Sequence, residues 1–241
     1  MKRLNFGFDL LYDIDDDEIA LMMAEENIRQ LDATRLYFER HWNEKSIEFR
    51  DQTRCIASFF ARINAPVSAK GCSQILIECT SNEGNSKIMN LSGTISVPVK
   101  FDYELFSSLS DLDKKKATLE LLMTGIRKVA DNQNWNVEPF EETYKKIIEL
   151  EYVNEWIWPK TAKNKDTGLV AKVFVQHEVR CADISIIIQD KKRNEILRKK
   201  VITERPHEFA YAIHLGEIKW VTDKKASLLN RTGDKEWSIE I

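Results

Sequence analysis

The sequence predicts an α+β protein in which antiparallel meander sheets flank a central two-helix segment, with a further helix near the N-terminus. Two observations predict this class. Apolar residues alternate in two separate regions of the chain, and between these regions the apolar period changes from two residues to 3.6. Helices and strands therefore occur in separate blocks, which is typical of α+β proteins, whereas a doubly wound sheet alternates them one by one.

The N-terminal region begins with a predicted strand over residues 4–12. A helix is predicted to start at Asp16 or Asp17, because acidic residues are favourable at the cap and in the first turn of a helix. Residues 36–42 fit either a strand or a helical continuation. Alternating apolar residues predict the next strand at about residues 47–63.

Two more strands are predicted at residues 73–79 and 95–105, with a polar turn at 81–85 after the first of them. The alternation at 95–105 is the strongest in the chain and indicates a strand with one wet face. Pro98 cannot donate a hydrogen bond to a neighbouring strand, so we expect an edge strand or a bulge there. An antiparallel meander is the simplest connection of these strands.

Between the two sheet regions, the 3.6-residue period predicts two amphipathic helices. Ser110, with Asp113 three residues later, predicts the start of the first helix, and the polar run at 131–134 predicts its end. Pro139 suits the first turn of the second helix, where no N–H is required. This helix should end before Pro159, because the residue before a proline avoids the helical conformation.

After a polar connector at residues 160–168, the alternation returns and predicts a second meander with a loop at 190–194. The predicted strands of this region cover residues 169–181, 184–188, 196–203, 209–221 and 237–241. The connector is the predicted boundary between an N-terminal region, 1–159, and a C-terminal region, 160–241. We expect the two regions to pack as one compact unit.

Composition excludes several classes of function. No apolar run approaches the roughly 18 residues of a membrane span, and no secretory signal precedes the four cysteines, so we predict free thiols and a cytoplasmic location. No Gly-rich phosphate loop, chelating Cys–His spacing or nucleophile motif occurs. We therefore predict no cofactor, no bound metal and no catalytic residue.

The formal net charge of −3 hides a segregation of charge along the chain. Residues 1–60 carry −5, residues 61–159 carry −3 and residues 160–241 carry +5. Such a bipolar surface can steer one oppositely charged partner, or can promote self-association into a homo-oligomer.

The segregated charge and the missing catalytic motifs favour a non-enzymatic protein that binds another protein. A bacterial immunity-type protein, which neutralises a toxin by occlusion, is the specific hypothesis, because occlusion needs no motif. We expect a basic partner to contact acidic residues of the N-terminal segment. These residues are Asp13, Asp15, Asp16, Asp17, Glu25 and Glu26.

Two other functions remain open. Asp13 and Asp15 have a D-x-D spacing that can hold Mg²⁺. In this spacing alone, the chain resembles the first motif of the haloacid-dehalogenase phosphatases. Glu217 and Lys219 resemble the metal-binding segment of PD-(D/E)xK nucleases. A metal-dependent phosphoesterase or nuclease would use these four residues. The other alternative is a nucleic-acid-binding module that uses the basic hairpin at 191–200. This hairpin has no interleaved aromatic residues on which bases could stack, which argues against the alternative.

Overall fold

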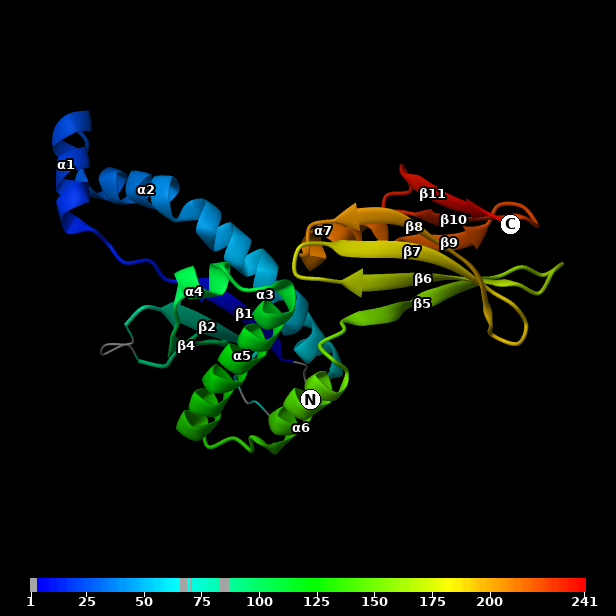
Figure 1. Ribbon diagram of the computed structural model, residues 1–241, viewed down its shortest axis with the longest axis horizontal. Coiled ribbons are helices and arrows are strands. Elements are labelled where there is room, and N and C mark those ends of the chain that lie inside the picture. The colour runs from blue at the N-terminus through cyan, green and yellow to red at the C-terminus, as the bar shows by residue number, and fades with distance from the viewer. Residues whose placement is uncertain (1–3, 66–68, 70, 83–86) are drawn as a thin grey trace. The chain divides into compact units, whose positions relative to one another are not determined.

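A computed structural model confirms the predicted α+β class (Figure 1). The structure describes residues 4–65, 69, 71–82 and 87–241. Its internal contacts divide the chain into an N-terminal unit, Met1–Tyr152, and a C-terminal unit, Val153–Ile241. The division falls ahead of the predicted boundary after residue 159, because strand β5 (Glu155–Lys163) belongs to a sheet of the C-terminal unit.

Among the described residues, the N-terminal unit contains a four-stranded sheet of order β1-β2-β4-β3. Its strands are β1 (Asn5–Leu10), β2 (Gln74–Thr80), β3 (Met89–Leu91) and β4 (Thr94–Lys100). β1, β2 and β4 run parallel, and β3 runs antiparallel to β4. This sheet departs from the predicted antiparallel meander. The helical segment between β1 and β2 supplies the long crossover that a parallel pair requires.

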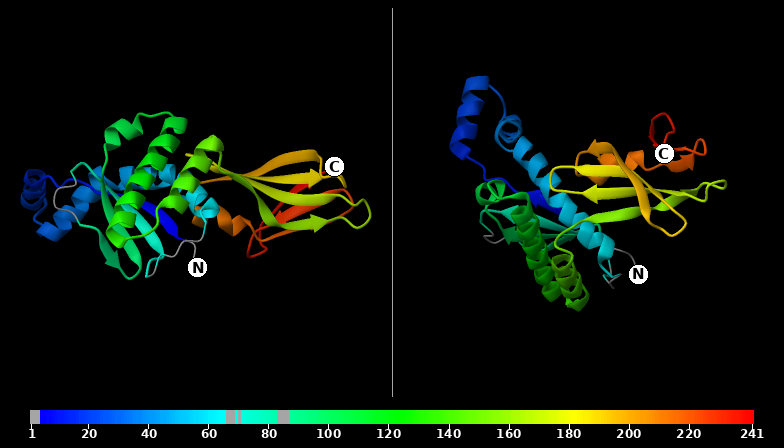
Figure 2. Two further views of the ribbon diagram at one scale, coloured as in Figure 1. Left: turned by 90° about the horizontal axis from the view of Figure 1, so that it is seen from below. Right: turned by 45° about the vertical axis from the view of Figure 1, so that its right-hand side comes forward.

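Helices cover one face of this sheet and extend beyond its end (Figures 1 and 2). The helices of this unit are α1 (Asp16–Glu26), α2 (Gln30–His41), α3 (Asn43–Ile63), α4 (Tyr103–Ser107), α5 (Asp111–Gln133) and α6 (Glu138–Glu149). α3 and α5 pack on the sheet, and α1 and α2 lie beyond its end. The ring of Phe6 in β1 packs edge to face on Phe60 of α3 and Phe140 of α6, with centroids 5.1 and 6.5 Å away. In the part of the chain that the structure describes, no helix has both the length and the apolar composition that a membrane crossing requires.

The predicted strand at residues 47–63 is wrong, because these residues belong to α3. Phe49, Ile56 and Phe60 are fully buried and recur at helical spacing, so one face of α3 packs on the core. The apparent alternation of two residues does not match this burial. For residues 36–42, the helical interpretation is the correct one, since α2 includes nearly all of them.

The structure confirms the two central helices. Ser110 caps α5 by accepting a hydrogen bond from the backbone N–H of Asp113 at 3.2 Å. Asn134, with a left-handed φ of 53°, ends the helix. α6 ends at Glu149, before Pro159 as expected, and Glu151 and Tyr152 beyond its end adopt left-handed φ angles of 52° and 60°.

A glycine allows α5 to lie close to the sheet. A methyl group at Gly125 would overlap the Cδ1 atom of Ile77 and would lie 3.2 Å from a methyl group of Val97. The position therefore requires glycine, although glycine inside a helix costs about 1 kcal/mol relative to alanine.

The sequence predicts an edge strand or bulge at Pro98 in β4 and a turn at 81–85 after β2. β3 pairs with β4 only over 94–96, so at Pro98 the described residues give β4 a single neighbour, β2. At Pro98, β4 is therefore an edge strand among the described residues, as expected. Of the turn predicted at 81–85, residues 83–85 lie outside the described residues.

The C-terminal unit consists of two antiparallel sheets, in agreement with the predicted meander. One has the order β5-β6-β7-β8, with β6 (Val170–His177), β7 (Ala182–Gln189) and β8 (Glu195–Glu204). The other has the order β11-β10-β9, with β9 (Glu217–Trp220), β10 (Lys225–Leu229) and β11 (Glu236–Glu240). Buried aliphatic side chains of both sheets form one core.

The prediction of a single strand at residues 209–221 is wrong. A short helix, α7 (Glu208–Tyr211), and a 3₁₀ turn, η1 (Ala212–His214), occupy its first part. The ring of His207 accepts a hydrogen bond from the backbone N–H of Phe209 at 3.2 Å and so caps α7. β10 was not predicted.

Candidate functional site

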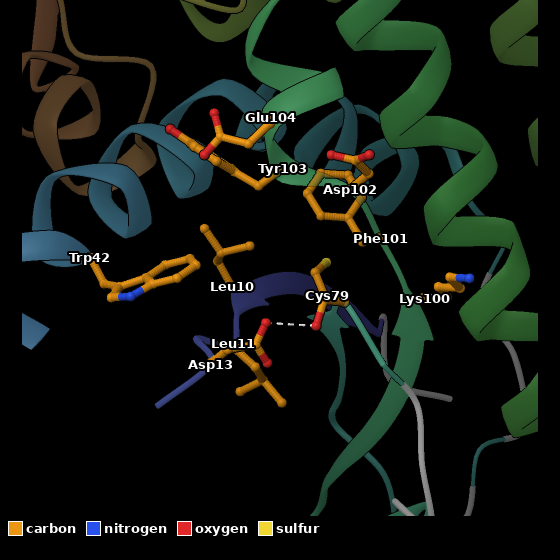
Figure 3. A pocket seen from close by; sticks show the side chains of 11 residues that line it. Leu10, Leu11, Asp13, Trp42, Cys79, Lys100, Phe101, Asp102, Tyr103 and Glu104 are labelled. Atoms are coloured by element: carbon orange, nitrogen blue, oxygen red, sulfur yellow. Dashed lines mark hydrogen bonds between the residues drawn. The ribbon is translucent and has the colours of Figure 1, made fainter. Parts of the chain in front are cut away.

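A crevice of about 600 Å³ opens at the carboxyl ends of the three parallel strands of the N-terminal unit (Figure 3). This edge is where open sheets with parallel strands usually bind ligands. We call it the strand-end crevice. It is lined by Leu10, Leu11, Asp13, Trp42, Cys79, Ser81, Lys100, Phe101, Asp102, Tyr103 and Glu104.

Two aromatic side chains of the crevice lie around an ammonium group. The Nζ atom of Lys45 is 5.1 Å from the centroid of Trp42 and 5.5 Å from that of Tyr103. The same atom forms an ion pair of 3.0 Å with Glu104. Aromatic faces next to a carboxylate stabilise cations, so this part of the crevice is suited to a positively charged group.

The polar groups of the crevice are held by hydrogen bonds from neighbouring segments. The carboxylate of Asp13 accepts a hydrogen bond from the hydroxyl group of Ser81 at 2.7 Å. The backbone carbonyl oxygen of Asp13 accepts one from the hydroxyl group of Tyr37 at 3.4 Å. Asp102 caps α4 by accepting the backbone N–H of Leu105 at 2.9 Å. Both carboxylates are therefore fixed at the rim where β1 and β4 end.

Two titratable groups of the crevice stay protonated at neutral pH. Burial, with a smaller effect from the charge of Asp9, raises the pKa of the Cys79 thiol well above its ordinary value. Burial also raises the pKa of Tyr103, and the carboxylates of Glu48 and Glu104 add to the effect. Neither group therefore supplies an ionised nucleophile at neutral pH.

An acidic segment adjoins the crevice. We call residues 11–42, which include α1 and α2, the acidic arm; Figure 1 shows these helices at the end of the N-terminal unit, beyond the sheet. The arm has a small core of its own. Its buried residues are Ile19, Met22, Ala33 and Tyr37. Residues 11–28 hold seven carboxylates and neither lysine nor arginine.

Three of the six predicted partner-binding acids have roles within the arm or the crevice. Asp13 bonds to Ser81, as described above. Asp15 caps α1 by accepting the backbone N–H groups of the second and third residues after it, at 3.1 and 3.0 Å. Glu26 forms an ion pair of 2.6 Å with Arg40 of α2. These contacts fix the arm and leave the three carboxylates less available to a partner.

The other three predicted acids, Asp16, Asp17 and Glu25, are exposed. Among the described residues, none of them has an ion-pair partner. Asp17, Leu21 and Glu25 lie four residues apart, so they follow one face of α1. Leu21 is 55% exposed on this face. The face therefore presents an apolar side chain between carboxylates.

The residues of the alternative metal site are divided between the two units. Asp13 and Asp15 belong to the N-terminal unit, and Glu217 and Lys219 lie in β9 of the C-terminal unit. Within residues 4–65, 69, 71–82 and 87–241, no group of three or more histidine, cysteine or acidic side chains is arranged to hold a metal ion.

The sequence prediction missed the aromatic residues of the crevice. Residues 101–105 were predicted as the end of a strand, whereas the strand ends at Lys100 and Tyr103 begins a helix. The signal that could have located this edge is Asp102, a favoured helix cap directly after an apolar strand. Trp42, between α2 and α3, carries no comparable signal.

No known protein family matches the chain, and no curated protein or solved structure is significantly similar to it. A fold alone does not define a function, so function has to be argued from the site. The site has two adjoining parts, the strand-end crevice and the acidic arm.

Proposed function

We propose that the chain binds a basic protein through the acidic arm and the strand-end crevice, and that it acts by this binding without catalysing a reaction. The observation that carries the proposal is the run of seven carboxylates without a cation at residues 11–28. Asp16, Asp17 and Glu25 have no ion-pair partner in the described chain. A cationic surface would relieve their mutual repulsion and would be steered toward the arm.

Exposed apolar side chains support a protein as the partner. Leu21 lies between Asp17 and Glu25 on α1, and Ile14 and Leu31 of the arm are also more than half exposed. Stable protein interfaces combine an apolar centre with a polar rim, and on α1 Leu21 lies between two carboxylates in this way. A small inorganic cation would use the carboxylates but would leave these apolar side chains in water.

The crevice supports an anchoring residue from the same partner. The aromatic faces of Trp42 and Tyr103 and the carboxylates of Asp13 and Glu104 fit an arginine or lysine side chain. Such a side chain would replace Lys45 between the two rings. In protein interfaces, a few residues contribute most of the binding energy, and an arginine buried in an aromatic pocket is often one of them.

Neutralisation of a toxin by occlusion is the specific form of this proposal. A toxin that acts on a polyanion such as nucleic acid carries a basic surface around its active site, and an acidic arm can cover that surface. The proposal includes a cytoplasmic location, which the free thiols of all four cysteines support.

The proposal is tested by capture of the partner with the full chain from lysate of the source cells, followed by titration of the purified partner. We expect a basic partner whose Kd rises at least about tenfold between about 50 and 300 mM salt, because salt screens attraction between exposed charges. An acidic partner, a Kd that does not depend on salt, or a second copy of the chain as the sole partner would contradict the proposal. Hydrolysis of a phosphodiester that needs Mg²⁺ and is lost in Asp13→Asn would favour the metal-dependent alternative.

A further inference from the structure

A second hollow, of about 580 Å³, lies in the C-terminal unit beside the two loops that join β5 to β6 and β7 to β8. We call it the basic cleft. Its cationic residues are Lys163, Lys165, Lys172, Lys191 and Arg193. Lys163 and Lys172 belong to β5 and β6, where their immediate neighbours Ala162 and Ala171 point to the core. The two lysines therefore stand on the outer face of the sheet.

The cations of the basic cleft are not neutralised within the protein. Among the described residues, none of the five has an ion-pair partner. Asp190 also lines the cleft, but its carboxylate accepts the backbone N–H groups of Lys192 and Asn194 at 2.8 and 2.9 Å. The bonds from Asn194 and Lys192 lower the pKa of Asp190, so this carboxylate stays ionised and holds the turn, and it is the one acidic group that lines the cleft among the described residues.

The two loops that border the cleft contact each other. A methyl group at Gly168 would overlap the side chain of Lys191, so Lys191 lies directly against the opposite loop. Gly168 has a φ of 75°, a conformation that favours glycine. Asn164, which is buried, holds the same loop by accepting the backbone N–H groups of Asp166 and Thr167 at 3.0 and 3.1 Å. The two loops, and with them Lys191, are therefore held together by contacts within the protein.

The hairpin at 191–200, one of the alternative sites predicted from the sequence, divides into two parts. Arg198 pairs with Glu195 at 2.7 Å, and Lys200 pairs with Asp183 at 3.0 Å. Lys199 donates a hydrogen bond to the backbone in β11 at 3.1 Å. The unpaired cations are those of the loop, and they gather with lysines of the neighbouring hairpin that the sequence prediction did not include.

We propose that the basic cleft binds consecutive phosphates of one anionic chain, either the backbone of a nucleic-acid strand or a free oligophosphate. Five unpaired cations around one hollow repel each other, and several linked phosphates neutralise them while releasing counterions. No aromatic residue of the described chain lines the cleft, so bases have no stacking surface there. Recognition is of phosphate alone and is independent of base sequence. This binding is separate from the protein-binding surface, since it uses the other unit.

The test is fluorescence anisotropy with the full-length chain and a labelled single-stranded oligonucleotide of about 12 nucleotides, with tripolyphosphate as competitor. We expect the logarithm of Kd to rise with the logarithm of salt concentration with a slope of about 3.5, because each phosphate contact on a single strand contributes about 0.7. The double variant Lys163→Gln/Lys172→Gln should lower this slope by about 1.4 and weaken binding by about tenfold at about 50 mM salt. Lys191→Gln/Arg193→Gln, which changes two exposed side chains, should do the same.

The matched control is Lys192→Gln, which removes an exposed cation of the same loop that does not line the cleft. We expect its Kd to change less than about twofold, since it loses no phosphate contact. Displacement of the oligonucleotide by tripolyphosphate at a similar concentration would identify a free oligophosphate as the ligand, and resistance to displacement would identify a strand. Failure of both probes to bind at low salt, a flat salt dependence, or an equal loss in Lys192→Gln would overturn the proposal. None of these outcomes bears on the binding of a basic protein by the arm.

Discussion

Phe49→Ala should lower the free energy of unfolding of the N-terminal unit by about 4 kcal/mol, because it leaves a cavity in the core. Phe49 is fully buried and its ring meets four other rings at centroid distances of 5.0 to 6.5 Å. These rings belong to Phe8, Phe101, Tyr103 and Phe106. The loss is a large part of the roughly 5–15 kcal/mol by which a domain is usually stable. Thermal and urea denaturation, followed by circular dichroism, measure it.

The matched control for Phe49→Ala is Leu105→Ala, which also removes an apolar side chain beside this cluster. Leu105 is 62% exposed, so we expect a change within about 0.5 kcal/mol. Equal denaturation midpoints for the two variants would contradict the assignment of Phe49 to the core. Because Phe101 and Tyr103 line the strand-end crevice, Phe49→Ala should also weaken partner binding under conditions in which the unit remains folded.

The triple variant Asp16→Lys/Asp17→Lys/Glu25→Lys should weaken binding of the basic partner by at least about 100-fold. This factor corresponds to about 2.7 kcal/mol, and like charges placed across an interface cost several kcal/mol. The variant Asp16→Asn/Asp17→Asn/Glu25→Gln should have a smaller effect of about tenfold, because it removes attraction without adding repulsion. Calorimetric titration with the captured partner measures both.

The control for the charge reversal is Asp131→Lys/Glu142→Lys/Glu149→Lys. These three exposed acids lie on α5 and α6 of the same unit, and no ion pair engages them in the described residues. The control changes net charge by the same amount, so a general field effect would appear in both triple variants. If the two variants weakened binding equally, the arm would not be the contact surface. The lysines introduced at positions 16 and 17 lie in the first turn of α1, where a positive charge destabilises a helix by roughly 0.3–1 kcal/mol. The melting curve of the arm variant is therefore recorded to show that the variant is folded.

Local signals were sufficient to predict much of the fold. Ser110 and Asn134 mark the ends of α5 by their own chemistry, and the alternation in β6 reflects a strand with one buried face. Strand direction was not predictable in the same way. β1 and β2 are far apart in sequence, and their parallel pairing depends on how α3 packs, which no local pattern states. The same packing decides that residues 47–63 are helical.

The candidate site was predictable only in part. Asp16, Asp17 and Glu25 form an acidic cluster within a short stretch of sequence, so composition alone indicated them. The aromatic walls come from Trp42 and Tyr103, which meet because strand ends and helix starts converge at one edge of the sheet. The basic cleft likewise joins two hairpins, and only one of them had a visible concentration of cations in the sequence.

Hydrogen–deuterium exchange of the chain, alone and with its captured partner, tests the central claim most directly. Amides that are covered by a partner, or whose local opening is suppressed, exchange more slowly. We expect slowed exchange across residues 13–26 and in the peptides that contain Trp42 and Tyr103, with no change in β5 to β8. Slowed exchange confined to the C-terminal unit, or unchanged exchange at residues 13–26 in a saturated complex, would contradict binding through the acidic arm.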